Sequence, residues 1–175
     1  MRYQSLLLLS LLVCGAVSAA ESAPERASWQ HHEVEFYYLG FTSLYTCDGL
    51  EDKVKLVLKQ FGARNDAKVR AMGCDYGAMA PSPHAWVKAN FDVLAPMAAD
   101  DQGESVNARW AAVELTPRRP DFMGEGECEL VAAMRPLITG NFALRDLNYR
   151  ATCTPHQISL SDYSVRGQVL RLDGK

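Results

Sequence analysis

Cysteines are the residues of this sequence whose chemistry is easiest to assign. Apart from Cys14, four are present, namely Cys47, Cys74, Cys128 and Cys153. A zinc site made of four thiolates needs closely spaced pairs such as C-x-x-C, and these cysteines lie far apart along the chain. An even number of cysteines in an exported chain favours two disulfides instead.

Histidines could bind a metal or act as general bases, and the sequence contains four. His31 and His32 are adjacent, but neighbouring side chains of a strand point to opposite faces and cannot chelate one ion together. His84 could pair with Ser43 or Ser82 in a hydrolytic site, although no G-x-S-x-G motif accompanies them. We therefore assign no catalytic residue, no metal site and no cofactor.

Aromatic residues gather in the segment 34–46, which combines a core strand with the loop that follows it. A second loop, residues 75–83, is expected at the same edge of the sheet, tied to the first through a Cys47–Cys74 bridge. Apolar side chains on such loops either bind a partner or cap the core. The predicted binding residues are Phe41, Leu44, Tyr45, Tyr76 and Met79.

The elements that position these residues follow from hydrophobic periodicity. Apolar residues recur with helical spacing after Cys47, and Gly62 supplies a left-handed residue at the end of this helix. Asp48 and Glu51 match a capping box at its start. The run 67–72 then alternates as a strand and leads to the next cysteine.

The second pair of cysteines encloses the same order of elements. A helical stripe covers residues 130–138, Gly140 is its expected end, and a strand from Phe142 to Cys153 follows. Pro136 falls inside the stripe and should kink or shorten its last turn. Because this strand is longer than the helix, either the strand bends or the helix starts near Gly126.

Further strands flank each of these segments, at residues 33–39, 84–94, 106–115 and 163–172. Each half therefore contains strand, helix, strand, strand. We predict an α+β fold in which two βαββ repeat units, residues 30–96 and 105–173, share one mainly antiparallel or mixed sheet of about six strands, with two helices on one face. Residues 97–104 form a polar linker. Identity between the halves is weak, so chance similarity is the alternative.

A helix that runs antiparallel to the next strand starts beside the end of that strand. The two cysteines of each unit are then neighbours, which predicts the pairings Cys47–Cys74 and Cys128–Cys153. Within the second unit, Arg118 and Arg119 stand between two prolines and indicate an exposed loop. The acidic residues that follow them lie near a helix N-terminus, where negative charge is favourable. They are Glu125, Glu127 and Glu129.

The N-terminus has the organisation of a secretory signal peptide. Arg2 precedes the apolar run 6–13, and small residues follow up to a cleavage site after Ala19. We expect residues 1–19 to be the signal peptide and residues 20–175 to form a single exported domain. The apolar run is shorter than the ~20 residues needed to span a bilayer, so we predict no transmembrane segment.

An alternative makes Cys14 the lipid-modified first residue of a lipoprotein. The position before such a cysteine prefers Gly, Ala or Ser, and here it holds the β-branched Val13. We therefore favour a periplasmic or secreted protein without this anchor.

The composition of the chain argues against some classes of function. The chain has 175 residues, of which 48% are hydrophobic and 22% charged, and a net charge of −3 gives no positive field to hold nucleic acid. We predict a noncatalytic exported binding or envelope-interaction module that binds an unknown protein or small ligand in the cell envelope. A secreted hydrolase with an unrecognised site and a periplasmic metal-handling protein are the alternatives.

The segment Tyr38-Leu39-Gly40-Phe41-Thr42-Ser43-Leu44-Tyr45-Thr46-Cys47, continuing to Val54 and then Phe61-Gly62-Ala63-Arg64, resembles small exported proteins of Gram-negative bacteria that have no assigned function. The resemblance implies export and a Gram-negative source. It implies no activity, cofactor or catalytic residue.

Overall fold

The computed structural model describes residues 23–76, 80–98, 100 and 102–174. The expected signal peptide, Cys14 and Met79 lie outside these residues. Six long strands form the main sheet: β1 (Glu25–Leu39), β2 (Lys68–Met72), β5 (His84–Pro96), β6 (Val106–Leu115), β7 (Leu144–Thr152) and β8 (Asp162–Leu172). The helices are α1 (Cys47–Gln60) and α2 (Cys128–Asn141), with short 3-10 turns η1 (Glu125–Glu127) and η2 (Ile158–Leu160).

The six strands are paired antiparallel in the order β2-β5-β1-β6-β8-β7. The predicted α+β fold with one six-stranded sheet and two helices is confirmed. Each half contributes three neighbouring strands in the same chain order, while the origin of the halves as copies of one unit stays a prediction. A hairpin of β3 (Asp75–Tyr76) and β4 (Ala80–Pro81) was not predicted.

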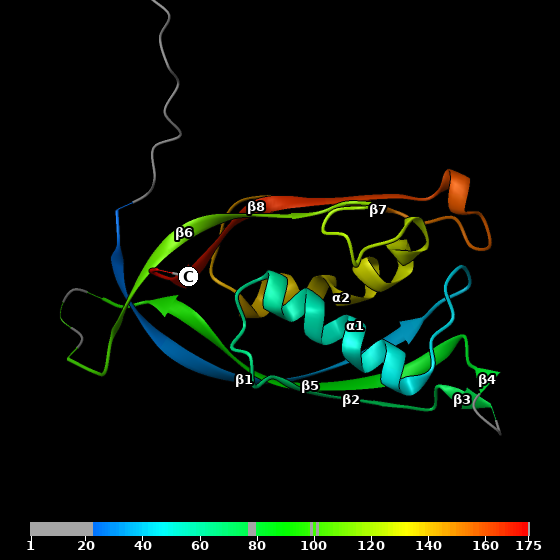
Figure 1. Ribbon diagram of the computed structural model, residues 1–175, viewed down its shortest axis with the longest axis horizontal. Coiled ribbons are helices and arrows are strands. Elements are labelled where there is room, and N and C mark those ends of the chain that lie inside the picture. Colours follow the sequence, from blue (N-terminus) through cyan, green and yellow to red (C-terminus); the bar gives the residue numbers. More distant parts are fainter. Residues whose placement is uncertain (1–22, 77–79, 99, 101, 175) are drawn as a thin grey trace, which may run out of the picture.

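The two halves of the sheet meet over a very short stretch, which we call the seam. Only Glu25, Arg26 and Ala27 of β1 pair with β6, opposite residues 106–108. Beyond the seam the halves separate, and α1 and α2 lie between them (Figure 1). At the far end, which we call the open end, β1 leads into α1 and β7 turns into β8 through η2.

Helix α1 forms largely as the sequence predicts, except at its start. Thr46 is the N-cap, because its side chain accepts a hydrogen bond from the Gly49 N–H at 3.2 Å. The expected capping box is wrong, because the buried Glu51 carboxylate instead accepts the backbone N–H of Ala71 on edge strand β2 at 3.1 Å. Gly62 is left-handed as expected, with φ of 93°.

Helix α2 contains Pro136 but continues to Asn141, one residue past the expected end at Gly140, so Pro136 does not shorten its last turn. The mismatch between this helix and its strand is absorbed in both of the ways considered. The 3-10 turn η1 extends the helix backwards, and β7 shifts register between Arg145 and Asn148. Cys128, at the start of α2, therefore lies beside Cys153, just after the end of β7.

Two disulfides join the first residue of each helix to the segment just after an edge strand. Cys47 is bonded to Cys74 with 5.2 Å between Cα atoms, and Cys128 to Cys153 with 5.6 Å. Both predicted pairings are confirmed.

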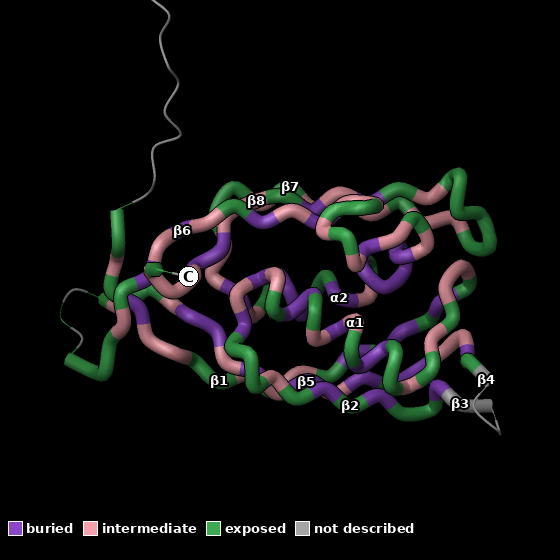
Figure 2. The backbone as a smooth tube through the Cα atoms, in the orientation of Figure 1, coloured by how far each residue is buried: buried purple, intermediate pink, exposed green. Residues whose placement is uncertain are grey.

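The core fills the space between the two half-sheets and includes both helices (Figure 2). A smaller apolar cluster lies at the seam. Its buried members are Ala27, Leu94, Ala108, Trp110 and Leu170. Among the described residues, no helix has the length and apolar character needed to cross a bilayer.

Removing one bridge tests how much the disulfides contribute. The variant Cys47→Ala/Cys74→Ala frees an unfolded loop with a sequence separation of 27 residues. We expect the free energy of unfolding to fall by about 3 kcal/mol, because the bridge restricts the unfolded chain. Urea unfolding of both proteins measures this value, and an unchanged free energy would contradict it.

Candidate functional site

The loop 40–46 connects β1 to α1 at the open end and carries three of the predicted binding residues. The Gly40 N–H donates to the Pro83 carbonyl at 2.6 Å, and Tyr45 forms an isolated β-bridge with Ser82. Loop 40–46 therefore lies beside residues 82 and 83, at the end of the second loop. A Cβ on Gly40 would approach the Tyr38 hydroxyl to 2.0 Å, so only glycine fits there.

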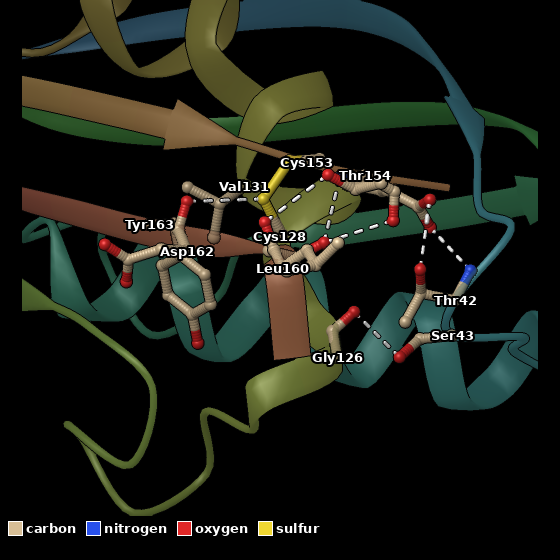
Figure 3. Close-up of a disulfide and its surroundings, with 12 residues drawn as sticks. Thr42, Ser43, Gly126, Cys128, Val131, Cys153, Thr154, Leu160, Asp162 and Tyr163 are labelled. Carbon is tan, nitrogen blue, oxygen red and sulfur yellow. Dashed lines mark hydrogen bonds between the residues drawn. A yellow bond between two sulfur atoms is a disulfide. The ribbon is translucent and has the colours of Figure 1, made fainter. Parts of the chain in front are cut away.

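A carboxylate from the second half holds this loop. Glu129, in the first turn of α2, accepts the N–H groups of Phe41 at 2.7 Å and Thr42 at 2.8 Å. Ser43 Oγ donates to the Gly126 carbonyl at 2.9 Å, beside the Cys128–Cys153 disulfide (Figure 3). A Cβ on Gly126 would meet that Oγ at 2.4 Å. Loop 40–46 is thus fastened across the open end.

Glu127 forms a second buried contact beside the first. Its carboxylate accepts a hydrogen bond from the Tyr45 hydroxyl and pairs with Lys53 Nζ of α1 at 2.9 Å. Burial raises the pKa of Glu127 to about 7 and lowers the pKa of Lys53. This group can hold or release a proton near neutral pH. Because the residue is only 7% exposed, we assign it a structural role rather than contact with a substrate.

The outer face of the first half carries an exposed apolar row across three strands. Tyr37 of β1 is opposite Trp86 of β5, which is in turn opposite Met72 of β2. These side chains are 49%, 45% and 55% exposed. With Leu39, at the end of β1, they form what we call the outer apolar surface. The Tyr37 ring lies 6.2 Å from that of Trp86 and 6.4 Å from that of His84.

Charged side chains border this surface. Lys88 of β5 is opposite both Glu35 and Arg70, and its Nζ lies 3.6 Å from the Glu35 carboxylate. Trp86 Nε1 donates to the same carboxylate at 3.2 Å. On the outer face, the apolar pair of Tyr37 and Trp86 is therefore followed directly by the charged pair of Glu35 and Lys88.

The predicted binding residues are distributed unevenly. Phe41 and Leu44 are exposed on loop 40–46, and the Phe41 ring lies 5.4 Å from that of His156 in the second half. Tyr45 is half-buried against the core and bonded to Glu127. The Tyr76 side chain lies outside the described part of the structure, as Met79 does.

Sequence reasoning missed Tyr37, Trp86 and Met72 as surface residues. In β1 both faces carry large apolar side chains, since buried Phe36 and Tyr38 flank exposed Tyr37. The alternation therefore could not indicate which face is covered.

The residues considered for a hydrolytic or metal site have other partners in the structure. Buried Ser82 accepts the backbone N–H of His84 at 3.3 Å, and Ser43 is engaged with Gly126. His31 pairs with Asp92, whereas His32 stacks on a core phenylalanine. Within the described ranges, no three His, Cys, Asp or Glu residues are grouped to hold a metal ion.

Comparisons with known protein families, curated proteins and solved structures gave no match for this chain.

The Glu129 contact predicts a stability effect. In Glu129→Ala two N–H groups lose a charged acceptor, so we expect the free energy of unfolding to fall by about 2 to 4 kcal/mol. Glu125→Ala, on the preceding 3-10 turn η1, is the matched control, because its exposed pair with Arg118 should contribute less than about 1 kcal/mol. Equal losses in the two variants would refute the special role of Glu129.

The pKa of Glu127 predicts a pH effect. The folded chain holds its proton up to about pH 7, whereas an ordinary Glu releases it near 4.5. Between about pH 4.5 and pH 7 the folded state binds this proton more tightly than the unfolded state, so the free energy of unfolding of the wild type falls as pH rises. Glu127→Gln cannot titrate, so the melting temperature of wild type should fall relative to the variant from about pH 5 to about pH 8. No relative change across this range would contradict the raised pKa and mean that Lys53 keeps the carboxylate ionised.

Proposed function

We propose that this protein is a noncatalytic exported binding module, acting in the periplasm or outside the cell, whose protein partner docks on the outer apolar surface. The two disulfides are consistent with export, because such bonds persist in oxidising compartments. The signal-peptide pattern at residues 1–19 supports the same location.

The row of Tyr37, Trp86 and Met72 is the observation that carries this proposal. Antiparallel sheets with one face on the core normally present polar side chains on the other face. Here the neighbouring pair Glu35 and Lys88 follows that rule, and the apolar row does not. Contiguous exposed apolar groups are typical of interaction sites.

The composition of this surface favours a protein partner over a small ligand. Tyrosine, tryptophan and methionine are enriched in the buried centre of protein interfaces, and charged groups form their rim. The side chains stand on paired strands, where little backbone ordering is needed on binding. Phe41 and Leu44 are also exposed, on the loop at the end of β1 that Glu129 keeps in place.

Site-specific photocrosslinking in cells that export the protein tests this proposal. Benzoylphenylalanine replaces Tyr37, and we expect one discrete adduct with a partner protein. Adding Trp86→Ser should reduce its yield roughly tenfold, because a central interface aromatic commonly contributes 2 kcal/mol or more. The melting temperature should stay nearly unchanged, since Trp86 is a surface side chain.

The matched control places the same photoreactive residue at Asn148, on the outer face of the second half. The proposal predicts that the adduct is absent there. The same adduct from both faces, or no adduct at position 37, would overturn the assignment of this surface.

A further inference from the structure

The outer face of the second half contains a pocket of quite different character. It has a volume of about 510 Å³ and lies between β6, β7, β8 and the turn that follows β6. Four arginines line it, two from the turn and two from the strands: Arg118, Arg119, Arg150 and Arg166. The first half carries aromatic side chains on its outer face, whereas this half gathers guanidinium groups.

The turn fixes the backbone positions of the first two arginines. Thr116 and Arg119 exchange backbone hydrogen bonds at 2.7 and 3.0 Å, and Arg118 N–H donates to the Met123 carbonyl at 3.0 Å. Met123 is buried and anchors the turn on the core. Arg118 has φ of 77°, a left-handed conformation that is disfavoured for a residue with a Cβ. Such conformations persist where the surroundings hold them, often at functional sites.

Carboxylates orient the guanidinium groups without neutralising them. Glu114 accepts Arg166 Nε at 2.9 Å with one oxygen, and its other oxygen lies 4.0 Å from Arg119. Arg150 pairs with Asp162, and Arg118 pairs with Glu125. Four arginines against these three acids, 4 − 3, leave a net charge of +1 at the pocket.

These ion pairs do not explain the cluster by stability. The arginine side chains are between 64% and 80% exposed, and exposed pairs contribute little to folding. Each guanidinium has five N–H donors, and the contacts described here engage one nitrogen of each group. Several donors therefore remain for a bound group.

We propose that this pocket binds a phosphoryl group. Planar guanidinium groups match the oxygens of a phosphate bidentately, and several arginines around one pocket can share its charge. Thr116 and Ser164 also line the pocket and bring hydroxyl groups. The group belongs either to a free phosphate or to the headgroup of an anionic lipid. This site is separate from the outer apolar surface and does not depend on the proposed function.

The first arm of the test is an NMR titration of the full exported chain with inorganic phosphate at low salt. Vesicles of phosphatidylglycerol, compared with vesicles of phosphatidylcholine, provide the second arm. We expect Arg118→Gln/Arg119→Gln to weaken binding roughly tenfold, through loss of charged hydrogen bonds. Glu114→Gln should strengthen it, because Arg119 and Arg166 lose a competing carboxylate.

Arg70→Gln is the matched control, because Arg70 is an equally exposed arginine on the outer face of the first half. Binding of phosphate that depends on Arg118 and Arg119 but not on Arg70 supports a site for free phosphate. The same dependence with phosphatidylglycerol vesicles alone supports a headgroup site. Absence of binding in both arms, or equal weakening by Arg70→Gln, would overturn the proposal, provided that thermal melts show every variant to be folded.

Discussion

The short seam between β1 and β6 is the constraint on which the rest of this structure depends. Three residue pairs cannot by themselves fix the relative position of two three-stranded half-sheets. The halves must therefore be held by what lies between them and by contacts at the open end. The helices supply the apolar part of that connection, since the core includes residues of both halves and both helices.

The contacts of Glu127 and Glu129 supply the polar part. A buried carboxylate is unfavourable unless hydrogen bonds or a positive charge compensate its lost hydration. Glu129 meets this requirement with backbone N–H groups of loop 40–46. Glu127 contacts Tyr45 and Lys53, but burial outweighs these contacts and raises its pKa to about 7. All of these partners belong to the first half. The same contacts hold the loop that presents Phe41 and Leu44.

Local patterns predicted the elements well and their long-range contacts poorly. The helical stripe and Gly62 identified α1, and the equal order of elements within the halves led to the correct cysteine pairs. Glu51 was assigned to a capping box because sequence shows only its neighbours along the chain, and its partner is Ala71 on an edge strand. The seam begins at Glu25, before the expected first strand. Pro136 does not end α2, which continues to Asn141.

Glu127 and Glu129 show the same limit at the candidate site. Their position near a helix N-terminus was visible in the sequence, but the loop they bind precedes them by more than eighty residues. Native-state hydrogen exchange of the Phe41 and Thr42 amides tests most directly whether this contact joins the halves. We expect both amides to exchange only with global unfolding, at a free energy within about 1 kcal/mol of that of unfolding. Exchange at much lower cost, with α2 still protected, would contradict it.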